Sequence, residues 1–268
     1  MIKWLVFFIL SLSLFHTKSE KQLQIVKKWD INADFFYTDH LLNIYAINQN
    51  EIFKANLKKT EEKKFSKSQA YNIYSIDVSD PFKVLVFYKD FNQILFLDKS
   101  LAEIKSPIQL DNYFFYDVVA VCNSASGGFW IFDAGKQQLV YFNNELSVRK
   151  KSASLGPLIG DFLDGTKIFM LEKNDYIYLG IKNIGVLMFD NYGSYIKTFP
   201  LKIETGFQVL DQNIVYYKSG ELFFYDLQKL EQKSIQLPVK KAVNARVENN
   251  YLFVQTIDQV LVYQWNHL

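Results

Sequence analysis

Histidine and cysteine, which most often supply general bases, nucleophiles and zinc ligands, are nearly absent from this sequence. The histidines are His16, His40 and His267, and the single cysteine is Cys122. None stands in a His-x-His, Cys-x-x-Cys or Glu-x-x-His spacing, so no zinc ligand set is present. A serine hydrolase triad would have to recruit His40, and the sequence has no nucleophile elbow to accompany it. Cys122 lies in VVAVCNS, which is typical of a buried strand and indicates an inert core thiol.

Acidic side chains leave calcium binding as the one metal chemistry to consider. Asp77, Asp117 and Glu172 lie on or beside short apolar runs that are predicted to be strands. Calcium prefers a shell of carboxylate and amide oxygens, so these residues would form a site if their strands converged. Isolated polar residues also occur on such strands without a metal, where water satisfies them. The sequence alone does not show convergence.

A run of aromatic residues offers a different function, which is binding. Residues 112–117 read Asn112, Tyr113, Phe114, Phe115, Tyr116 and Asp117. Four consecutive aromatics cannot all point into one sheet interface, so we expect one or two to be exposed. Aromatic side chains held on a rigid rim are good anchors for a protein or a glycan. The alternative is that they fill the end of a channel or pack between sheets.

The elements that position these residues are predicted to be strands throughout. The chain is 49% apolar and 17% aromatic, with 24 Phe and 17 Tyr, and these side chains suit a half-buried pleated surface. Short alternating apolar runs recur after residue 20, separated by polar turns of a few residues. No convincing long amphipathic helix interrupts them.

One apolar run that ends on a polar residue recurs six times. The copies are IFKAN (52–56), ILFLD (94–98), LVYFN (139–143), VLMFD (186–190), LFFYD (222–226) and VLVYQ (260–264). A period of about forty residues is that of one four-stranded propeller blade. A β-sandwich would need far fewer strands and would have no such period. The sequence therefore predicts an all-β propeller of six four-stranded blades.

The two ends of the chain predict how the ring closes. The last repeat has only three strands before the sequence stops, and LQIVKKWDI (23–31) reads as an unpaired fourth strand. We expect this N-terminal strand to pair beside residues 259–265 and complete the last blade.

The repeat resembles the six-bladed NHL-like and YncE-like propellers that bacteria export. The resemblance covers about residues 22–265 and is most distinctive in DVSDPFKVLVFYKDFNQILFLDKSLAEI (77–104). It implies the fold, and it implies no particular activity, because unrelated functions share this fold. The Gly-His and Trp-Asp pairs of WD40 repeats and the Gly-Gly pairs of kelch repeats are missing.

The N-terminus is typical of an export signal. Lys3 precedes a twelve-residue apolar run, Trp4 to Phe15, and Thr17 and Ser19 suit a cleavage before Glu20. Twelve apolar residues fall short of the roughly twenty that a spanning helix needs. We therefore expect residues 1–19 to be a signal peptide, residues 20–268 to be a single propeller domain without a transmembrane segment, and the product to be periplasmic or attached peripherally to the envelope.

Charge argues against nucleic acid as a partner. Loss of residues 1–19 would remove two lysines and no acid, which takes the formal charge from +2 to zero. A neutral chain lacks the basic face that binds a phosphate backbone. The arginines are Arg149 and Arg246 alone, so bidentate phosphate contacts are weakly supplied as well.

Binding is the function class that the sequence favours. The usual strand order of a propeller puts the loops between blades on one face, together with the turns between second and third strands. We expect that face to bind an envelope or outer-membrane protein partner, without enzymatic activity or a cofactor. The residues predicted to make contact are Trp29, Phe91, Asn112, Tyr113, Phe114, Phe115 and Tyr116. The alternatives are a calcium-dependent, lactonase-like hydrolase with its site in the central channel, and a glycan-binding module.

Overall fold

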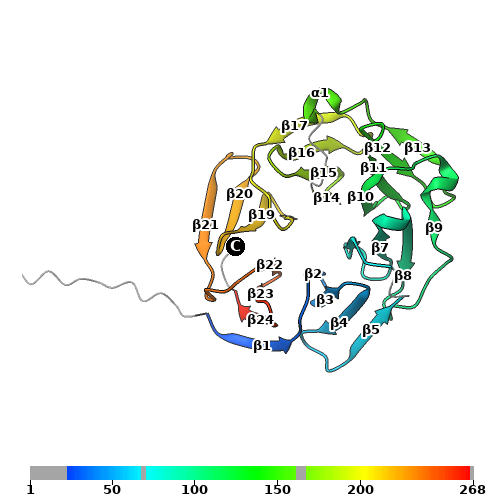
Figure 1. The fold of residues 1–268 in the computed structure, drawn as a ribbon. Helices are drawn as coiled ribbons and strands as arrows, with labels where there is room; N and C mark the ends of the chain where they lie inside the picture. The colour runs from blue at the N-terminus through cyan, green and yellow to red at the C-terminus, as the bar shows by residue number, and fades with distance from the viewer. Residues whose placement is uncertain (1–22, 68–70, 161–166, 266–268) are drawn as a thin grey trace, which may run out of the picture.

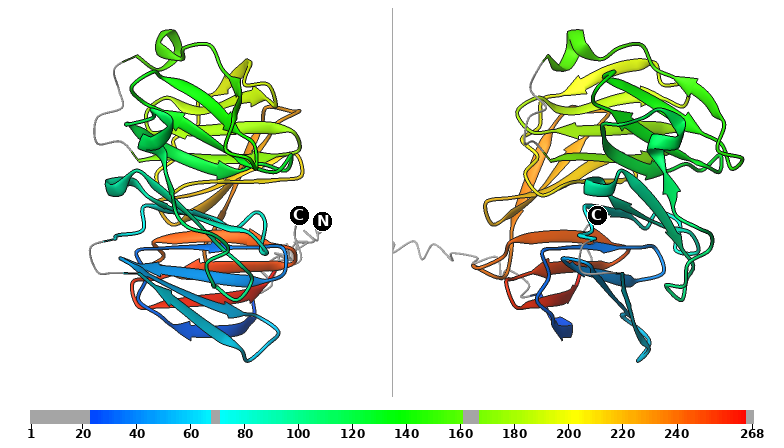
Figure 2. Two further views of the ribbon diagram at one scale, coloured as in Figure 1. Left: turned by 90° about the vertical axis from the view of Figure 1, so that its right-hand side faces the viewer. Right: turned by 45° about the vertical axis from the view of Figure 1, so that its right-hand side comes forward.

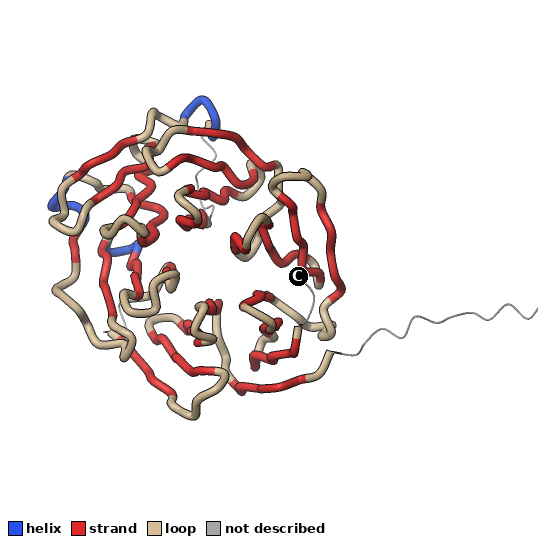
Figure 3. Tube along the Cα trace, turned by 180° about the vertical axis from the view of Figure 1, so that it is seen from behind, coloured by secondary structure: helices blue, strands red, loops and turns tan. Residues whose placement is uncertain are grey.

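A computed structural model describes residues 23–67, 71–160 and 167–265 of the chain. These residues form six four-stranded antiparallel sheets arranged in a ring, each running from an inner strand at the centre to an outer strand at the rim (Figures 1 and 3). The prediction of a six-bladed β-propeller is confirmed. The expected signal peptide lies outside the described residues. Within the described part, no helix is long and apolar enough to cross a membrane.

The blades follow one another along the chain. Blade 1 consists of β2 (Phe35–Thr38), β3 (Asn43–Asn48), β4 (Glu51–Asn56) and β5 (Glu62–Ser66). Blade 2 consists of β6 (Ser75–Asp77), β7 (Val84–Tyr88), β8 (Gln93–Leu97) and β9 (Ile108–Gln109). Blade 3 consists of β10 (Val118–Asn123), β11 (Phe129–Asp133), β12 (Gln138–Phe142) and β13 (Val148–Lys151).

The second half of the ring repeats the pattern. Blade 4 consists of β14 (Ile168–Lys173), β15 (Tyr176–Ile181), β16 (Gly185–Asp190) and β17 (Tyr195–Phe199). Blade 5 consists of β18 (Gln208–Leu210), β19 (Asn213–Lys218), β20 (Glu221–Asp226) and β21 (Gln232–Gln236). Blade 6 consists of β22 (Asn244–Glu248), β23 (Tyr251–Gln255), β24 (Gln259–Gln264) and the N-terminal β1 (Ile25–Asp30).

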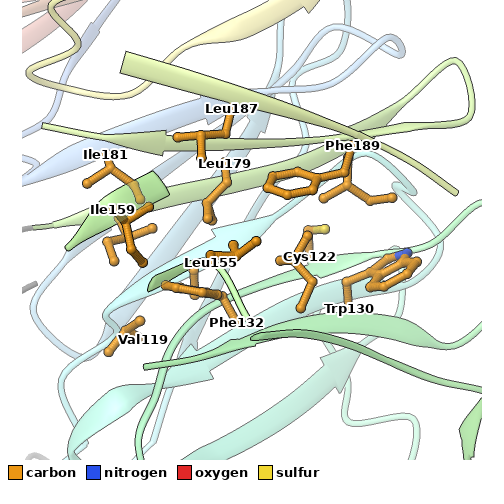
Figure 4. Packing of buried hydrophobic residues seen from close by; sticks show 14 of the residues in the cluster. Val119, Cys122, Trp130, Phe132, Leu155, Ile159, Leu179, Ile181, Leu187 and Phe189 are labelled. Atoms are coloured by element: carbon orange, nitrogen blue, oxygen red, sulfur yellow. The ribbon is translucent and has the colours of Figure 1, made fainter. Parts of the chain in front are cut away.

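The core lies between the blades, because the central strands of each sheet are covered on both faces. In β7 every residue is buried: Leu85 and Phe87 pack against blade 3, and the alternate residues pack against blade 1. The described residues contain six such clusters, one for each junction between blades. Figure 4 shows the cluster between blades 3 and 4, where Cys122 and Trp130 face Leu179 and Phe189.

The ring is closed by the first strand of the chain. β1 pairs antiparallel with β24, with Trp29 opposite Val260, and the two lie side by side at the edge of the ring (Figure 1). The Trp29 side chain is buried between blade 6 and blade 1, against Phe36 and Phe253. The Gln255 amide nitrogen also donates to the Ala33 carbonyl at 2.6 Å, which ties the same two blades together. The predicted closure is therefore confirmed.

The strand order gives the disc two different faces. The linker face carries the loops from each outer strand to the next inner strand and the turns between second and third strands. The hairpin face carries the other turns. Three short helices lie in the loops of the linker face: η1 (Lys89–Phe91) and η2 (Leu110–Tyr113), at the left in the left view of Figure 2, and α1 (Gly156–Ile159), at its top.

The closure generates the first prediction, which uses the protein from residue 20 onward. Trp29→Ala should lower the free energy of unfolding by about 3–5 kcal/mol, since it opens a cavity between blades 6 and 1. Lys28→Ala in the same strand is the matched control. Its exposed ion pair with Asp30 contributes little, so that change should stay within about 0.5 kcal/mol of wild type. Urea titrations followed by circular dichroism measure both.

Deletion of residues 20–31 is the harsher form of the same experiment. It should lower the unfolding midpoint of the whole domain in one transition. A deletion variant that melts like wild type would show that β1 does not close the ring.

Candidate functional site

The aromatic run predicted to bind a partner divides into exposed and buried residues. Phe114 and Tyr116 are 71% and 68% exposed on the linker face. Phe115 is only 3% exposed, and Tyr113 is half-buried. The rings of Tyr113 and Phe115 both pack edge-on against Phe142, with centroids 5.6 and 5.5 Å from it. Phe114 and Tyr116 are therefore the aromatic anchors that this loop presents to solvent.

A left-handed turn explains why neighbouring residues point opposite ways. Phe114 has φ 65° at the end of η2, and its N–H donates to the Asp111 carbonyl at 3.0 Å. A non-glycine residue seldom adopts this conformation, and here it turns the Phe114 side chain outward. The Phe115 N–H then donates back to the Leu110 carbonyl at 3.3 Å, which directs the next ring inward.

Two of the predicted contact residues, Trp29 and Phe115, are buried, and two others, Phe91 and Asn112, are at least partly exposed. The prediction that Trp29 belongs to the binding rim is wrong in its placement, because its side chain fills the junction between blades 6 and 1. Phe115 is corrected in the same way, since it belongs to the core between blades 2 and 3. Phe91 is half-buried and stacks on Tyr71, with centroids 3.9 Å apart and planes at 15°. Asn112 is exposed beside the aromatic pair.

Polar contacts from two neighbouring turns anchor the exposed loop. The Asn92 amide donates to the Asp111 carboxylate and to the Phe115 carbonyl. From the next blade, the Lys136 ammonium donates to the Phe114 carbonyl at 3.3 Å and lies 4.6 Å from the centre of the Phe115 ring. Because the loop is held from both sides, Phe114 and Tyr116 are presented with little freedom to lose on binding.

The calcium candidates lie around the central channel, where Asp77 and Glu172 already serve as structural acceptors. The Asp77 carboxylate accepts from the N–H groups of Ser79 and Asn123 at 2.7 and 2.8 Å, which joins blades 2 and 3. The Glu172 carboxylate accepts from the Ala125 N–H and the Trp130 indole N–H, both at 2.8 Å, which joins blades 3 and 4. Burial raises the pKa of Asp77 above its usual range.

The third candidate does not approach these two. Asp117 is exposed and precedes β10, whereas Asn123, which binds Asp77, is the last residue of that strand. Six residues of extended chain separate Asp117 from Asn123, or about 20 Å. In the described parts of the chain, no three or more His, Cys, Asp or Glu side chains gather where they could hold a metal ion. Asp117 therefore lies at the other end of the channel from Asp77 and Glu172.

The channel contains a cavity of about 180 Å³ to which all six inner strands contribute. Its lining extends to the turns at His40, Ser79 and Lys173, so the cavity reaches the hairpin face rather than the aromatic rim. Arg246 from β22 lies in the cavity wall, with its guanidinium carbon 4.9 Å from the centre of the Tyr37 ring. Burial raises the pKa of Tyr37 to about 12, so its hydroxyl stays protonated.

Sequence reasoning noted Arg246 only as one of two arginines and did not place it in the channel. A signal was present in NARVEN (244–249), where a charged residue alternates with Ala245 and Val247 in an otherwise apolar strand. Alternation shows that the Arg246 side chain points to the opposite side of the strand from Ala245 and Val247. It cannot show that Tyr37, more than two hundred residues earlier, lies opposite.

The linker-face end of the channel is also basic and aromatic. The Lys167 ammonium lies 4.3 Å from the centre of the Phe35 ring and 5.5 Å from that of Tyr74. Burial lowers the pKa of Lys167. Cys122, in contrast, is fully buried with its thiol pKa well above the ordinary value, in agreement with an inert core thiol.

The geometry defines a six-bladed propeller with an aromatic rim on one face and a channel cavity that reaches the other. No family model matches the sequence, and no curated protein does. Among solved structures, the chain is similar to virginiamycin B lyase from Staphylococcus aureus, with a TM-score of 0.58 and 10% identity over 90% of this chain and 99% of that one.

Two further solved structures share the architecture. BamB from Moraxella catarrhalis matches with a TM-score of 0.52 and 10% identity over 91% of this chain and all of that one. The Pan2 WD40 domain from Neurospora crassa matches with a TM-score of 0.55 and 9% identity over 88% of this chain and 90% of that one. Identities this low show the fold alone.

The Glu172 contacts generate the second prediction. Glu172→Gln should lower the free energy of unfolding by about 1–3 kcal/mol, because an amide can accept from only one of the two donors and opposes the other with its own N–H. Glu204→Gln, at an exposed position, is the matched control and should be neutral. Urea titration followed by tryptophan fluorescence measures both, and equal midpoints would show that the Trp130 bond contributes nothing.

The separation of the acids generates the third prediction. Millimolar calcium, compared with EGTA, should leave the melting temperature unchanged, because Asp77 and Glu172 are engaged by N–H donors and Asp117 lies elsewhere. Differential scanning calorimetry measures it. A rise with calcium that disappears in Asp77→Asn would contradict the expectation and locate a metal ion in the channel.

Proposed function

We propose that this protein is a non-enzymatic interaction module of the cell envelope that docks a protein partner on the linker face. The observation that carries the proposal is the pair Phe114 and Tyr116, two large aromatic side chains exposed on an anchored loop. Exposed aromatics on a rigid base are the residues that most often dominate binding energy at protein interfaces.

The fold does not choose between catalysis and binding. The solved structures with this architecture include a lyase, BamB and a WD40 domain. Function must therefore be argued from the site. In the described residues, the acids of the channel do not converge on a metal, and Cys122 is buried, which favours binding over hydrolysis.

The envelope setting is supported by the N-terminal sequence. A basic residue followed by a largely apolar run of twelve residues and a small-residue cleavage site is the pattern of an exported protein. An export route would bring the propeller to the periplasm or the envelope surface, where a protein of the outer membrane is the natural partner. Glycan binding is the second candidate, because exposed aromatic rings also stack on sugars.

A capture experiment tests the docking site and is the fourth prediction. The tagged protein from residue 20 is incubated with detergent-solubilised envelopes, and bound proteins are identified by mass spectrometry. The double variant Phe114→Ala, Tyr116→Ala should lose the partner that wild type captures, with an unchanged melting temperature because both side chains are solvent-exposed.

Tyr192→Ala is the matched control, since Tyr192 is also 68% exposed but lies in a turn of the hairpin face. It should capture the partner as wild type does. If the double variant captures it equally well, the linker-face rim is not the docking site. Release of the partner by soluble envelope polysaccharide, with direct polysaccharide binding by wild type, would favour the glycan function instead.

A further inference from the structure

The channel holds an arginine whose guanidinium no described residue hydrogen-bonds. Arg246 makes no ion pair or hydrogen bond within the described part of the chain, and its Nε is buried without a partner. Its guanidinium carbon lies 4.9 Å from the centre of the Tyr37 ring, and the charges of Glu248 and Asp77 act on it from beyond ion-pairing distance. A guanidinium offers five N–H donors in a planar fork, and burying them unpaired is costly. The cavity in front of Arg246 is where acceptors for these donors would lie.

The acids that line the same cavity differ in how many hydrogen bonds their carboxylates already accept. Asp77 accepts one hydrogen bond within its own turn and one from blade 3, and Glu172 accepts two from blade 3. Asp39 accepts four hydrogen bonds, one from Leu41 in its own turn and three from Asn43 and Tyr45 of β3. Glu248 is different, because none of the hydrogen bonds or ion pairs between described residues uses its carboxylate.

Arg246 and Glu248 lie on the same side of one strand. They are two residues apart in β22, so both side chains project from the same face, with Cα atoms about 7 Å apart. Both line the cavity, and they are not within ion-pairing distance of each other. The pair therefore presents a donor fork and an acceptor side by side, each directed to the same small volume.

We infer that the channel binds a small zwitterion, such as a free amino acid, whose carboxylate is held by Arg246 and whose ammonium is held by Glu248. A ligand with only an anionic group would be opposed by the acids around Arg246. A ligand with only a cationic group would be opposed by Arg246 itself. A molecule that carries both charges a few bonds apart satisfies the two free groups together, and about 180 Å³ suits one of amino-acid size.

Two other groups in the cavity suit such a ligand. The protonated Tyr37 hydroxyl is a further donor in the channel, and the Thr38 hydroxyl is buried without a partner. Both residues line the cavity from β2 of blade 1, next to β22. This site is distinct from the aromatic rim, since it reaches the hairpin face, so its failure and that of the docking proposal are independent.

Isothermal titration of the purified protein from residue 20 with each common free amino acid tests the site and is the fifth prediction. Propionate and propylamine are the single-charge controls. At least one amino acid should bind and raise the melting temperature, and neither control should. Arg246→Gln and Glu248→Gln should each weaken binding by about 30-fold or more, because each leaves one charge of the ligand unpaired in a buried site.

Arg149→Gln is the matched control, since the other arginine is exposed on the outer strand β13. It should bind the ligand like wild type. The inference is overturned if no amino acid binds wild-type protein, or if propionate binds as tightly as the amino acid and Glu248→Gln has no effect. The wild-type panel decides even if Arg246→Gln does not fold.

Discussion

The structure depends on apolar packing between adjacent blades around a closed ring. A four-stranded sheet in this chain is apolar on both faces, so no blade can be stable with either face open to water. Each junction therefore needs the next one, and the last junction, between blades 6 and 1, needs β1. Trp29 fills that junction from the N-terminal strand, while β22, β23 and β24 near the other end of the chain supply the rest of the sheet. Closure makes stability a property of the whole ring.

This constraint also decides where function can lie. Faces of the blades are buried and outer strands are polar, which leaves the loops of the two disc faces and the channel. On the linker face the exposed aromatics Phe114 and Tyr116 stand on a loop held by the side chains of Asn92 and Lys136. In the channel they come from inner strands whose spacing the ring fixes. The rim therefore presents apolar surface, whereas the channel presents charge.

Much of the fold could be predicted from the sequence, because the forty-residue period and the unpaired first strand can both be read along the chain without knowing any contact between distant residues. The site could be predicted only in part. Alternation does not extend through a turn, so it could not tell that Phe114 faces solvent while Phe115 packs on Phe142; the left-handed φ of Phe114 decides that. Trp29 was misplaced although its strand was predicted, because the sequence does not show that its side chain enters the junction between blades 6 and 1.

The channel was beyond sequence reasoning because it is assembled from all six repeats at once. Arg246 stands on the inner strand of the blade that β1 completes, and Tyr37 stands on the inner strand of blade 1. Their stack therefore spans the seam where the ring closes. Any change that loosens the contact between blades 6 and 1 moves the Arg246 guanidinium relative to the Tyr37 side chain. A ligand that binds residues of both blades would in turn stabilise the closed propeller. Ring closure and channel occupancy are thus linked through the same pair of blades.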